Sequence, residues 1–141
     1  MLIIGIVSLY ANPLHLGHIH YINAAKHQSE LLIAIINNDK QVDLKGSIKF
    51  MDQNHRLAIV QNLKAIDKVL LSTSSDTTVC KDLSLIKEQF PLAHITFYNS
   101  GDRKDGNIKE IETCDRLIIH RAFLDLPKIY SSSELKCNPK T

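Results

Sequence analysis

Two continuous apolar runs rich in β-branched residues, Leu2–Val7 and Leu31–Ile36, stand out in the N-terminal part of the chain. A run without polar alternation is typical of a strand that is buried on both faces, as the strands of parallel sheets are. Between the two runs, Leu16, Ile19 and Ile22 recur with a spacing near 3.6 residues, which predicts a helix. The pattern therefore predicts a βαβ unit with a right-handed crossover.

The alternation of strand and helix patterns continues along the chain. Asp52 is a suitable helix N-cap, and Ser131 with Glu134 forms a capping-box pattern that predicts a short terminal helix. The other predictions are a helix that begins after Asp52 and carries Leu57, Ile59, Val60 and Leu63, strands over Lys68–Leu71, His94–Tyr98 and Arg116–His120, and a helix over Val79–Phe90. We therefore expect a single α/β domain, residues 1–141, with a Rossmann-like open parallel sheet of about five strands and helices on both faces.

Composition argues against several classes of protein. Seventeen Lys and Arg against fifteen Asp and Glu give a net charge of +2, too balanced to indicate a nucleic-acid or membrane surface. The apolar runs are too short to cross a bilayer, and no basic segment precedes Leu2–Leu9 as in a signal peptide. Cys80, Cys114 and Cys137 are widely spaced, which favours a reducing compartment over a disulfide scaffold. We therefore expect a cytoplasmic protein whose partners include neither nucleic acid nor membrane.

The loop between the first predicted strand and the first predicted helix carries the strongest chemical signal. It reads Asn12-Pro13-Leu14-His15-Leu16-Gly17-His18, so two imidazoles flank a glycine that lets a ligand approach the backbone. The helix N-terminus adds unpaired N–H groups and the positive end of the helix dipole. In an open parallel sheet, ligands bind outside the carboxyl ends of the strands. These groups together suit the charge that builds on a phosphoryl group during transfer.

This His-x-Gly-His motif, with Asn-Pro just upstream, resembles the signature of the nucleotidyltransferase superfamily, which includes cytidylyltransferases and the phosphopantetheine and nicotinamide-nucleotide adenylyltransferases. Further segments, in the same order, resemble parts of glycerol-phosphate cytidylyltransferases and heptose-phosphate adenylyltransferases. These segments are Asn37-Asn38-Asp39 with Lys45-Gly46, then Arg56, Asn99-Ser100-Gly101-Asp102-Arg103 and Ser131-Ser132-Ser133. The resemblance therefore covers nearly the whole chain.

The resemblance implies a role for each matched residue. His15 and His18 would contact the triphosphate and stabilise the pentavalent transition state, and Lys45 would reach the α-phosphate from a mobile loop. Asp39 and Arg56 would contact the second substrate or the phosphates. The other nucleotide contacts would come from Ser8, Leu9, Tyr10 and Asn12, from Asp102 and Arg103 at the sugar and base, and from Ser131, Ser132 and Ser133 at the β- and γ-phosphates.

The resemblance also implies a reaction. A phosphate of the second substrate would attack the α-phosphorus of CTP or ATP in line and release pyrophosphate, which asks the protein for positioning and electrostatics. Mg²⁺ would accompany the triphosphate, held mainly by phosphate oxygens and water. The acceptor would be a phosphorylated sugar or polyol, and CTP is slightly favoured because relatives this short are often cytidylyltransferases. Such relatives commonly form dimers, so we expect a homodimer.

Departures from the family pattern leave other functions open. Leu9 and Ala11 are substitutions at the end of the first strand, and Ser100 replaces the first glycine of a Gly-Gly-Asp loop. A non-catalytic nucleotide-binding module with the same fold is therefore an alternative. A flavodoxin-like electron carrier or response domain is weaker, because the chain lacks an acidic phospho-acceptor cluster and the two motif histidines would stay unexplained.

The singled-out residues also have structural interpretations. The two motif histidines could form a turn and a helix cap, and His20 and His27 are interpreted as ordinary helix residues. Zinc binding by the clustered histidines lacks a third ligand nearby. Lys45 and Arg56 could be solvated charges, and Ser131–Ser133 alone is typical of a helix cap. The three cysteines are interpreted as inert thiols.

Overall fold

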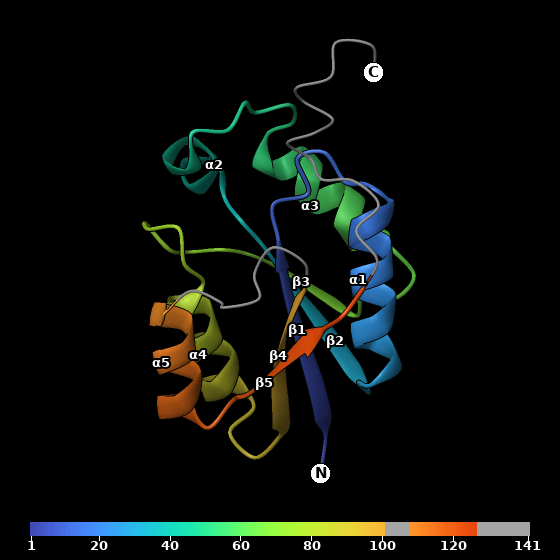
Figure 1. Ribbon diagram of the computed structural model, residues 1–141, viewed down its shortest axis with the longest axis vertical. Coiled ribbons are helices and arrows are strands. Elements are labelled where there is room, and N and C mark those ends of the chain that lie inside the picture. Colours follow the sequence, from blue (N-terminus) through green and yellow to red (C-terminus); the bar gives the residue numbers. More distant parts are fainter. Residues whose placement is uncertain (101–107, 127–141) are drawn as a thin grey trace.

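The computed structural model describes residues 1–100 and 108–126. Its strands form one five-stranded parallel sheet in the order β3-β2-β1-β4-β5 (Figure 1). The strands are β1 (Ile3–Leu9), β2 (Leu31–Ile36), β3 (Lys68–Leu71), β4 (His94–Ser100) and β5 (His120–Leu124), and the helices are α1 (Leu16–His27), α2 (Asp39–Lys45), α3 (Gln53–Gln61), α4 (Cys80–Gln89) and α5 (Ile108–Leu117). The predicted Rossmann-like open parallel sheet is confirmed.

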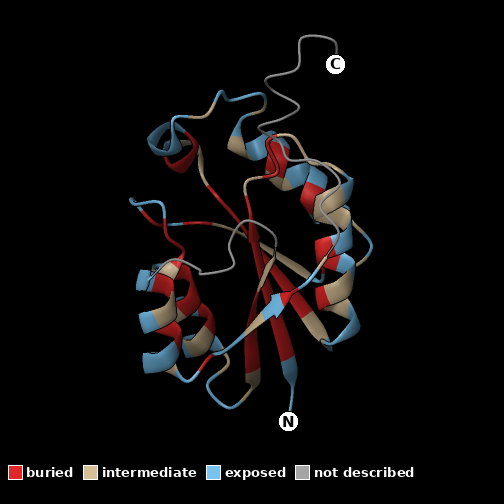
Figure 2. Cartoon of the chain, in the orientation of Figure 1, coloured by how far each residue is buried: buried red, intermediate tan, exposed pale blue. Residues whose placement is uncertain are grey.

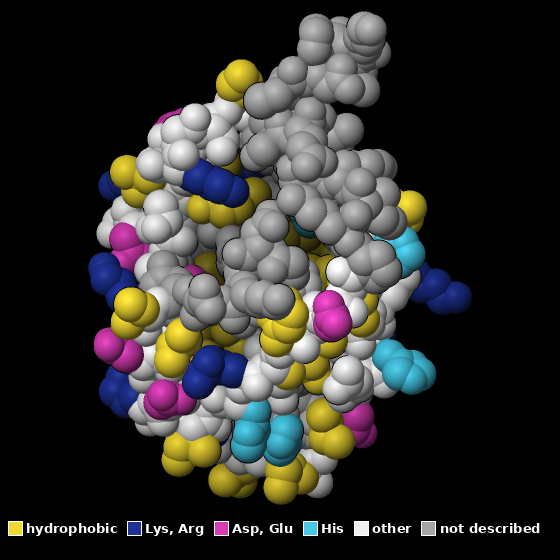
Figure 3. All heavy atoms as spheres, in the orientation of Figure 1, with side chains coloured by type: hydrophobic (Ala, Val, Ile, Leu, Met, Phe, Trp, Pro, Cys, Tyr) yellow, Lys and Arg dark blue, Asp and Glu magenta, His cyan; other side chains and the backbone are white. Residues whose placement is uncertain are grey.

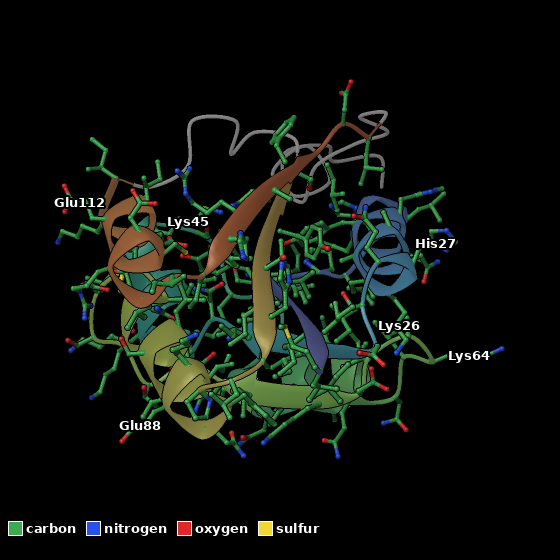
Figure 4. The ribbon with its side chains drawn as sticks, turned by 90° about the horizontal axis from the view of Figure 1, so that it is seen from below. Lys26, His27, Lys45, Lys64, Glu88 and Glu112 are labelled. Carbon is green, nitrogen blue, oxygen red and sulfur yellow. The ribbon has the colours of Figure 1, made fainter. Side chains whose placement is uncertain are left out.

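Helices cover both faces of the sheet. Helices α1 and α3 lie on one side and α4 and α5 on the other, as seen from below in Figure 4, where Lys26 and His27 mark α1, and Glu88 and Glu112 mark the opposite pair. The central strands β1, β2 and β4 are buried on both faces, while the outer surfaces of the helices are exposed (Figure 2). This burial explains why β1 and β2 appear in the sequence as uninterrupted apolar runs.

Side chains alternate between two hydrophobic clusters along the central strands. The cluster on the α1 and α3 side includes Val7, Leu9, Ile22, Ala25, Leu32, Ala34, Ile36 and Val60. The cluster on the α4 and α5 side includes Ile4, Ile6, Ile33, Ile35, Leu83, Ile86, Ile95, Phe97 and Cys114. Successive residues of a strand point to opposite faces, so each apolar run supplies both clusters.

The surface carries charges of both signs. On the face shown in Figure 3, basic and acidic side chains are interspersed, in keeping with the net charge of +2. Within residues 1–100 and 108–126, none of the helices has the length and the apolar character needed to cross a membrane.

Several element boundaries agree closely with the sequence patterns. The bounds of β2 and β3 are those predicted, and α4 and β4 differ from their predictions by one or two residues at an end. Asp52 is the N-cap of α3, and its carboxylate accepts the backbone N–H of His55 at 2.9 Å. Strong local signals therefore set these boundaries.

The predicted strand over Arg116–His120 is wrong. Arg116 and Leu117 end α5, and β5 begins only at His120. Ile118 has a left-handed backbone (φ 58°) and is 75% exposed, so it lies in the turn between the two elements. The apolar run over these residues therefore comes from a helix end and a turn, and β5, at the edge of the sheet, has no such run.

The prediction of Lys45 in a mobile loop is also wrong, because Lys45 is the last residue of α2. This helix begins at Asn38, whose side chain forms a capping box with Gln41, and it ends at Gly46, which has a left-handed φ of 76°. Seven residues are too few for a clear helical period, so the caps are the main signal. The predicted terminal helix at Ser131 and Glu134 lies outside the described residues.

Candidate functional site

The direction of strand addition reverses between β1 and β4. The chain runs from β1 outward through β2 to β3 and then crosses back to β4 and β5 on the other side. In an open α/β sheet, ligands bind at this switch point, outside the carboxyl ends of the strands. The loop with the two motif histidines follows the carboxyl end of β1 (Figure 1). The topology therefore brings the strongest sequence motif to the position where a ligand is expected.

His15 and His18 begin helix α1 together. His15 is the N-cap, and its Nδ1 accepts the backbone N–H of Gly17 at 3.0 Å. The Nδ1 atom of His18 accepts the backbone N–H of His15 at 3.1 Å. The two rings lie 3.9 Å apart between centroids, with their planes 30° apart. The pair therefore forms a capping box from two imidazoles, with both rings held against each other.

This arrangement fixes which nitrogen of each neutral ring carries the proton. Because Nδ1 is an acceptor in both rings, a neutral ring has its N–H at Nε2. Burial, and then the positive charges of His15 and Lys45, lower the pKa of His18 from 6.5 to about 3. His18 is therefore neutral at pH 7, and its Nε2–H is a hydrogen-bond donor for an anionic ligand.

The lowered pKa of His18 predicts that the fold becomes less stable in acid. Below pH 6.5 the unfolded chain binds a proton at His18, whereas the folded chain does so only near pH 3. The free energy of unfolding should therefore fall by up to about 1.4 kcal/mol per pH unit across this window, from its full value above pH 6.5. Urea unfolding at a series of pH values measures this slope. His18→Gln, which cannot titrate, should show a shallower slope, and equal slopes would contradict the assignment.

Lys45 contacts the loop that carries the two histidines. Its Nζ atom is 4.4 Å from the centroid of the Tyr10 ring, a cation–π contact between the end of α2 and the loop after β1. The charge of Lys45 also contributes to the lowered pKa of His18. The structure therefore places Lys45, at the end of α2, against the loop that carries the other two predicted catalytic residues, His15 and His18.

Arg56 is fully buried and joins four segments of the chain. Its Nη1 donates to the carbonyls of Tyr10 and Asn37, at 2.7 and 2.6 Å, and its Nε donates to the Met51 carbonyl at 3.1 Å. Its Nη2 forms an ion pair with Asp39 at 2.9 Å. Arg56 thus fixes the ends of β1 and β2 relative to α2 and α3. These bonds support a positioning role for Arg56 and Asp39.

Asn12 holds the segment between α2 and α3 against the loop after β1. Its Nδ2 donates to the Ile48 carbonyl at 2.8 Å, and its Oδ1 accepts the backbone N–H groups of Phe50, at 2.9 Å, and Met51, at 3.3 Å. Asn12 is only 2% exposed. The side chain therefore helps to shape the site by fixing this segment.

The end of β1 is part of the hydrophobic core. The side chains of Leu9 and Ala11 pack in the cluster that contains Tyr21 and Val60, and Ala11 has a left-handed φ of 54°. Ser8, also in β1, is buried. A nucleotide contact at Leu9 would therefore come from its backbone, and the substitutions at Leu9 and Ala11 are accommodated by packing.

The amide side chains of Asn38 and Gln41 lie near the site and have no assigned role in the sequence predictions. Gln41, which is fully buried, donates from Nε2 to the carbonyls of Asp76 and Thr78, at 2.8 and 2.9 Å. Asn38 donates to the carbonyls of Ser72 and Ser74, both at 3.0 Å. Together they fix the start of α2 to the segment after β3. Their Asn-x-x-Gln spacing is a capping-box signal that could have identified this helix start.

The other predicted nucleotide contacts, Asp102, Arg103, Ser131, Ser132 and Ser133, lie outside the described residues.

The described residues of the site do not form a cage for magnesium. Around the two histidines they offer ring nitrogens and an ammonium group, whereas Mg²⁺ prefers oxygen ligands. The carboxylate of Asp39 is paired with Arg56. Within residues 1–100 and 108–126, no group of three or more His, Cys, Asp or Glu could hold a metal ion. A magnesium ion at this site would therefore need the oxygens of a bound phosphate and water.

Comparison with curated proteins finds relatives that match part of the chain. The FAD synthase of Thermoplasma volcanium is 36% identical over 63 residues, which are 45% of this chain and 44% of that protein. The bifunctional protein HldE of Psychromonas ingrahamii is 37% identical over 59 residues, 40% of this chain and 12% of that protein. The match thus spans less than half the length of each of these relatives.

Solved structures share the fold over nearly the whole chain. The lipopolysaccharide core biosynthesis protein of Thermoplasma volcanium has a TM-score of 0.68 at 23% identity, covering 93% of this chain and all of that one. The nicotinic acid mononucleotide adenylyltransferase of Plasmodium falciparum has a TM-score of 0.59 at 16% identity, covering 95% of this chain and 82% of that one.

A family model covers most of the chain and includes the site. The cytidylyltransferase-like model matches residues 10–138, a range that contains both motif histidines, Asp39, Lys45 and Arg56. The same range contains the segments that resemble nucleotidyltransferases in the sequence. The chain belongs to the cytidylyltransferase-like family of nucleotidyltransferases.

Proposed function

We propose that this protein transfers a nucleoside monophosphate from a nucleoside triphosphate to the phosphate of a small molecule. An oxygen of the acceptor phosphate attacks the α-phosphorus, and a new P–O–P bond forms. The bond from the α-phosphorus to the oxygen bridging to the β-phosphorus breaks, and pyrophosphate leaves with the electron pair. No covalent bond to the protein is needed, so its task is to position the phosphates and to stabilise their charge.

The observation that carries this proposal is the histidine pair at the start of α1. Two adjacent imidazoles whose Nδ1 atoms are occupied by backbone N–H groups can offer Nε2–H donors to phosphate oxygens. Because His18 stays neutral, its Nδ1 can accept the His15 N–H while its Nε2–H donates to a ligand. Preorganised donors of this kind act most strongly on the charge that develops in the transition state.

Lys45 supplies the positive charge in this proposal. Its ammonium group lies over Tyr10, close enough to His18 to affect the pKa of that ring. A lysine ammonium group at this position can stabilise the negative charge that builds on the oxygens of the α-phosphate. Arg56 and Asp39 act on the reaction through the loops that they hold, and Mg²⁺ would enter with the triphosphate and balance its charge.

The names of the relatives favour ATP over CTP as the donor. FAD, which the relatives named FAD synthase are named for, contains an AMP unit whose phosphate is bonded to the phosphate on a ribityl chain, so that the two phosphates form a diphosphate. Transfer of AMP to a phosphorylated polyol chain would follow the chemistry proposed above. We therefore propose adenylyl transfer to a phosphorylated sugar or polyol, with CTP as the alternative donor.

A pyrophosphate-release assay tests this proposal. The protein would be incubated with Mg²⁺ and each of the four nucleoside triphosphates, together with sugar phosphates, polyol phosphates or flavin mononucleotide as acceptors. We expect release with one triphosphate, ATP first, that depends on the acceptor. If no pair releases pyrophosphate, the transferase proposal is wrong. Calorimetry that then finds triphosphate binding would favour the non-catalytic nucleotide-binding module.

Replacing Lys45 by Met should lower the catalytic efficiency (kcat/KM) by roughly a hundredfold, because one preorganised positive charge at the phosphates is lost. Lys49→Met is the matched control, because Lys49 lies in the next segment and pairs with Asp43 at 3.6 Å. That variant should keep the activity of the wild-type protein. Pyrophosphate release under saturating acceptor measures both. A similar loss in the two variants would point to general surface charge instead of a specific Lys45 contact.

The expected homodimer is part of the same proposal. Light scattering at the concentration used in the assay tests it, and a monomeric mass in an active sample would rule out a dimer as the working form.

A further inference from the structure

Strands β1 and β4 extend beyond the point where their pairing stops. Their register begins with Ile3 opposite His94 and ends with Ile6 opposite Phe97. Yet β1 continues to Leu9 and β4 continues to Ser100. The two strands therefore separate at their carboxyl ends, at the switch point beside the histidine pair.

The next hydrogen bond of this ladder can be named from the earlier ones. The backbone N–H of His94 donates to the Leu2 carbonyl at 2.9 Å. In a parallel ladder the same pattern repeats every second residue along each strand. Continued to the carboxyl end, it would join the N–H of Ser8 directly to the carbonyl of Tyr98.

A tyrosine hydroxyl from α1 occupies the place of that bond. The Ser8 N–H donates to the Oη atom of Tyr21 at 3.3 Å, and the Tyr21 hydroxyl donates to the Tyr98 carbonyl. The bond that would close the ladder is thus replaced by two bonds in series through one oxygen. Tyr21 is only 7% exposed, so this hydroxyl sits inside the fold.

We propose that Tyr21 is a positioning residue whose hydroxyl holds the ends of β1 and β4 apart and so sets the place of the Ser8–Tyr10 backbone beside a bound nucleotide. The second part of this proposal rests on the proposed function. Tyr21 lies one helical turn after His18 on the same helix. Helix α1 would thus fix the phosphate-binding rings with its first turn and the strand spacing with its second.

The proposed role of Tyr21 depends on its hydroxyl and not on its aromatic ring. A phenylalanine could fill the same space in the hydrophobic cluster to which Tyr21 belongs. The hydroxyl, however, is both acceptor and donor, which is what a site between an N–H and a carbonyl requires. Without it, the Ser8 N–H and the Tyr98 carbonyl must pair directly, which brings the strands together, or stay buried without partners.

Tyr21→Phe tests the inference, with Ile22→Val as the matched control. The control removes one buried methyl group from the neighbouring position of α1 and leaves the hydroxyl bridge in place. Both variants should melt at a temperature lower by a few degrees. In calorimetry with Mg-ATP and Mg-CTP, only Tyr21→Phe should bind its triphosphate at least about tenfold more weakly, since the Ser8–Tyr10 backbone shifts. Equal affinities in the two variants would overturn the positioning role.

Amide hydrogen exchange tests the spacer itself and needs no ligand. In the wild-type protein and in Ile22→Val, the Ser8 amide should exchange slowly, and in Tyr21→Phe its exchange should change at least about tenfold relative to the other β1 amides. An unchanged exchange rate together with an unchanged chemical shift of the Ser8 amide would overturn the spacer, because a direct bond to the Tyr98 carbonyl alters the shift and a lost bond alters the rate. If the wild-type protein binds no triphosphate, the proposed function and the positioning role both fail, while the exchange result still decides whether Tyr21 holds the strand ends apart.

Discussion

Replacing His18 by Gln should slow pyrophosphate release at least about a hundredfold while the fold stays in place. The substitution removes the imidazole Nε2–H that we assign to the phosphates, and one preorganised donor is worth about this factor or more. Glutamine is a favoured residue at the third position of a capping box, where its side-chain oxygen can accept the His15 N–H as Nδ1 does now. The variant thus separates the catalytic role of the ring from its capping role.

His20→Gln is the matched control for this experiment. His20 lies on the same helix and is exposed. The same His-to-Gln substitution is thus made outside the pair of histidine rings. Its rate should equal that of the wild-type protein, and circular dichroism at pH 7 should show all three proteins folded. If His18→Gln keeps more than half of the activity, then His18 is only a helix cap and the mechanism proposed here is wrong.

Replacing Arg56 by Ala should cost about 3–5 kcal/mol of folding stability, because it removes one partner of a buried ion pair. The change leaves three backbone carbonyls and the Asp39 carboxylate without their donor. Those carbonyls belong to the ends of β1 and β2 and to the segment before α3. The loss of stability is expected to be large because Arg56 is buried and donates several hydrogen bonds, whereas an exposed Arg has fewer protein partners.

Urea unfolding measures this loss, with Arg121→Ala as the control. Arg121 is exposed and pairs with Asp115 at 3.7 Å, so its removal should cost less than about 1 kcal/mol. Arg56→Lys should fall between the two, because it keeps the charge but offers one nitrogen instead of three. Similar unfolding midpoints for Arg56→Ala and Arg121→Ala would show that Arg56 does not join the segments energetically.

The sequence predicts most of the sheet because a strand that is buried on both faces appears in the sequence as an uninterrupted apolar run. The run Leu31–Ile36 is apolar throughout since both of its faces are covered, and its strand has those bounds. Strand β5 has no such run, because it lies at the edge and most of its side chains are exposed. The run that ends α5 and passes through Ile118 resembles a buried strand, and only the tertiary packing distinguishes the two.

Some residues of the site are positioned by their neighbours in the sequence, and others by partners far away in the chain. The rings of His15 and His18 meet because a helix start brings residues three apart together, and this was predictable from the motif. The burial of Arg56 and the reach of Tyr21 to Tyr98 depend on partners far away in the chain. In the sequence, Arg56 resembles an ordinary surface residue and Tyr21 an ordinary core residue. No local sequence rule therefore predicts that either belongs to the site.

The position of β1 at the centre of the sheet has a consequence for how the protein is made. Its neighbour β2 follows soon in the chain, whereas its other neighbour, β4, begins only at His94. While the chain is being synthesised, one edge of β1 therefore stays unpaired, and an open edge with apolar side chains such as Ile4 and Ile6 favours association with other chains. Completion of β4 closes that edge and, in the same step, creates the gap between the two strand ends beside the histidines.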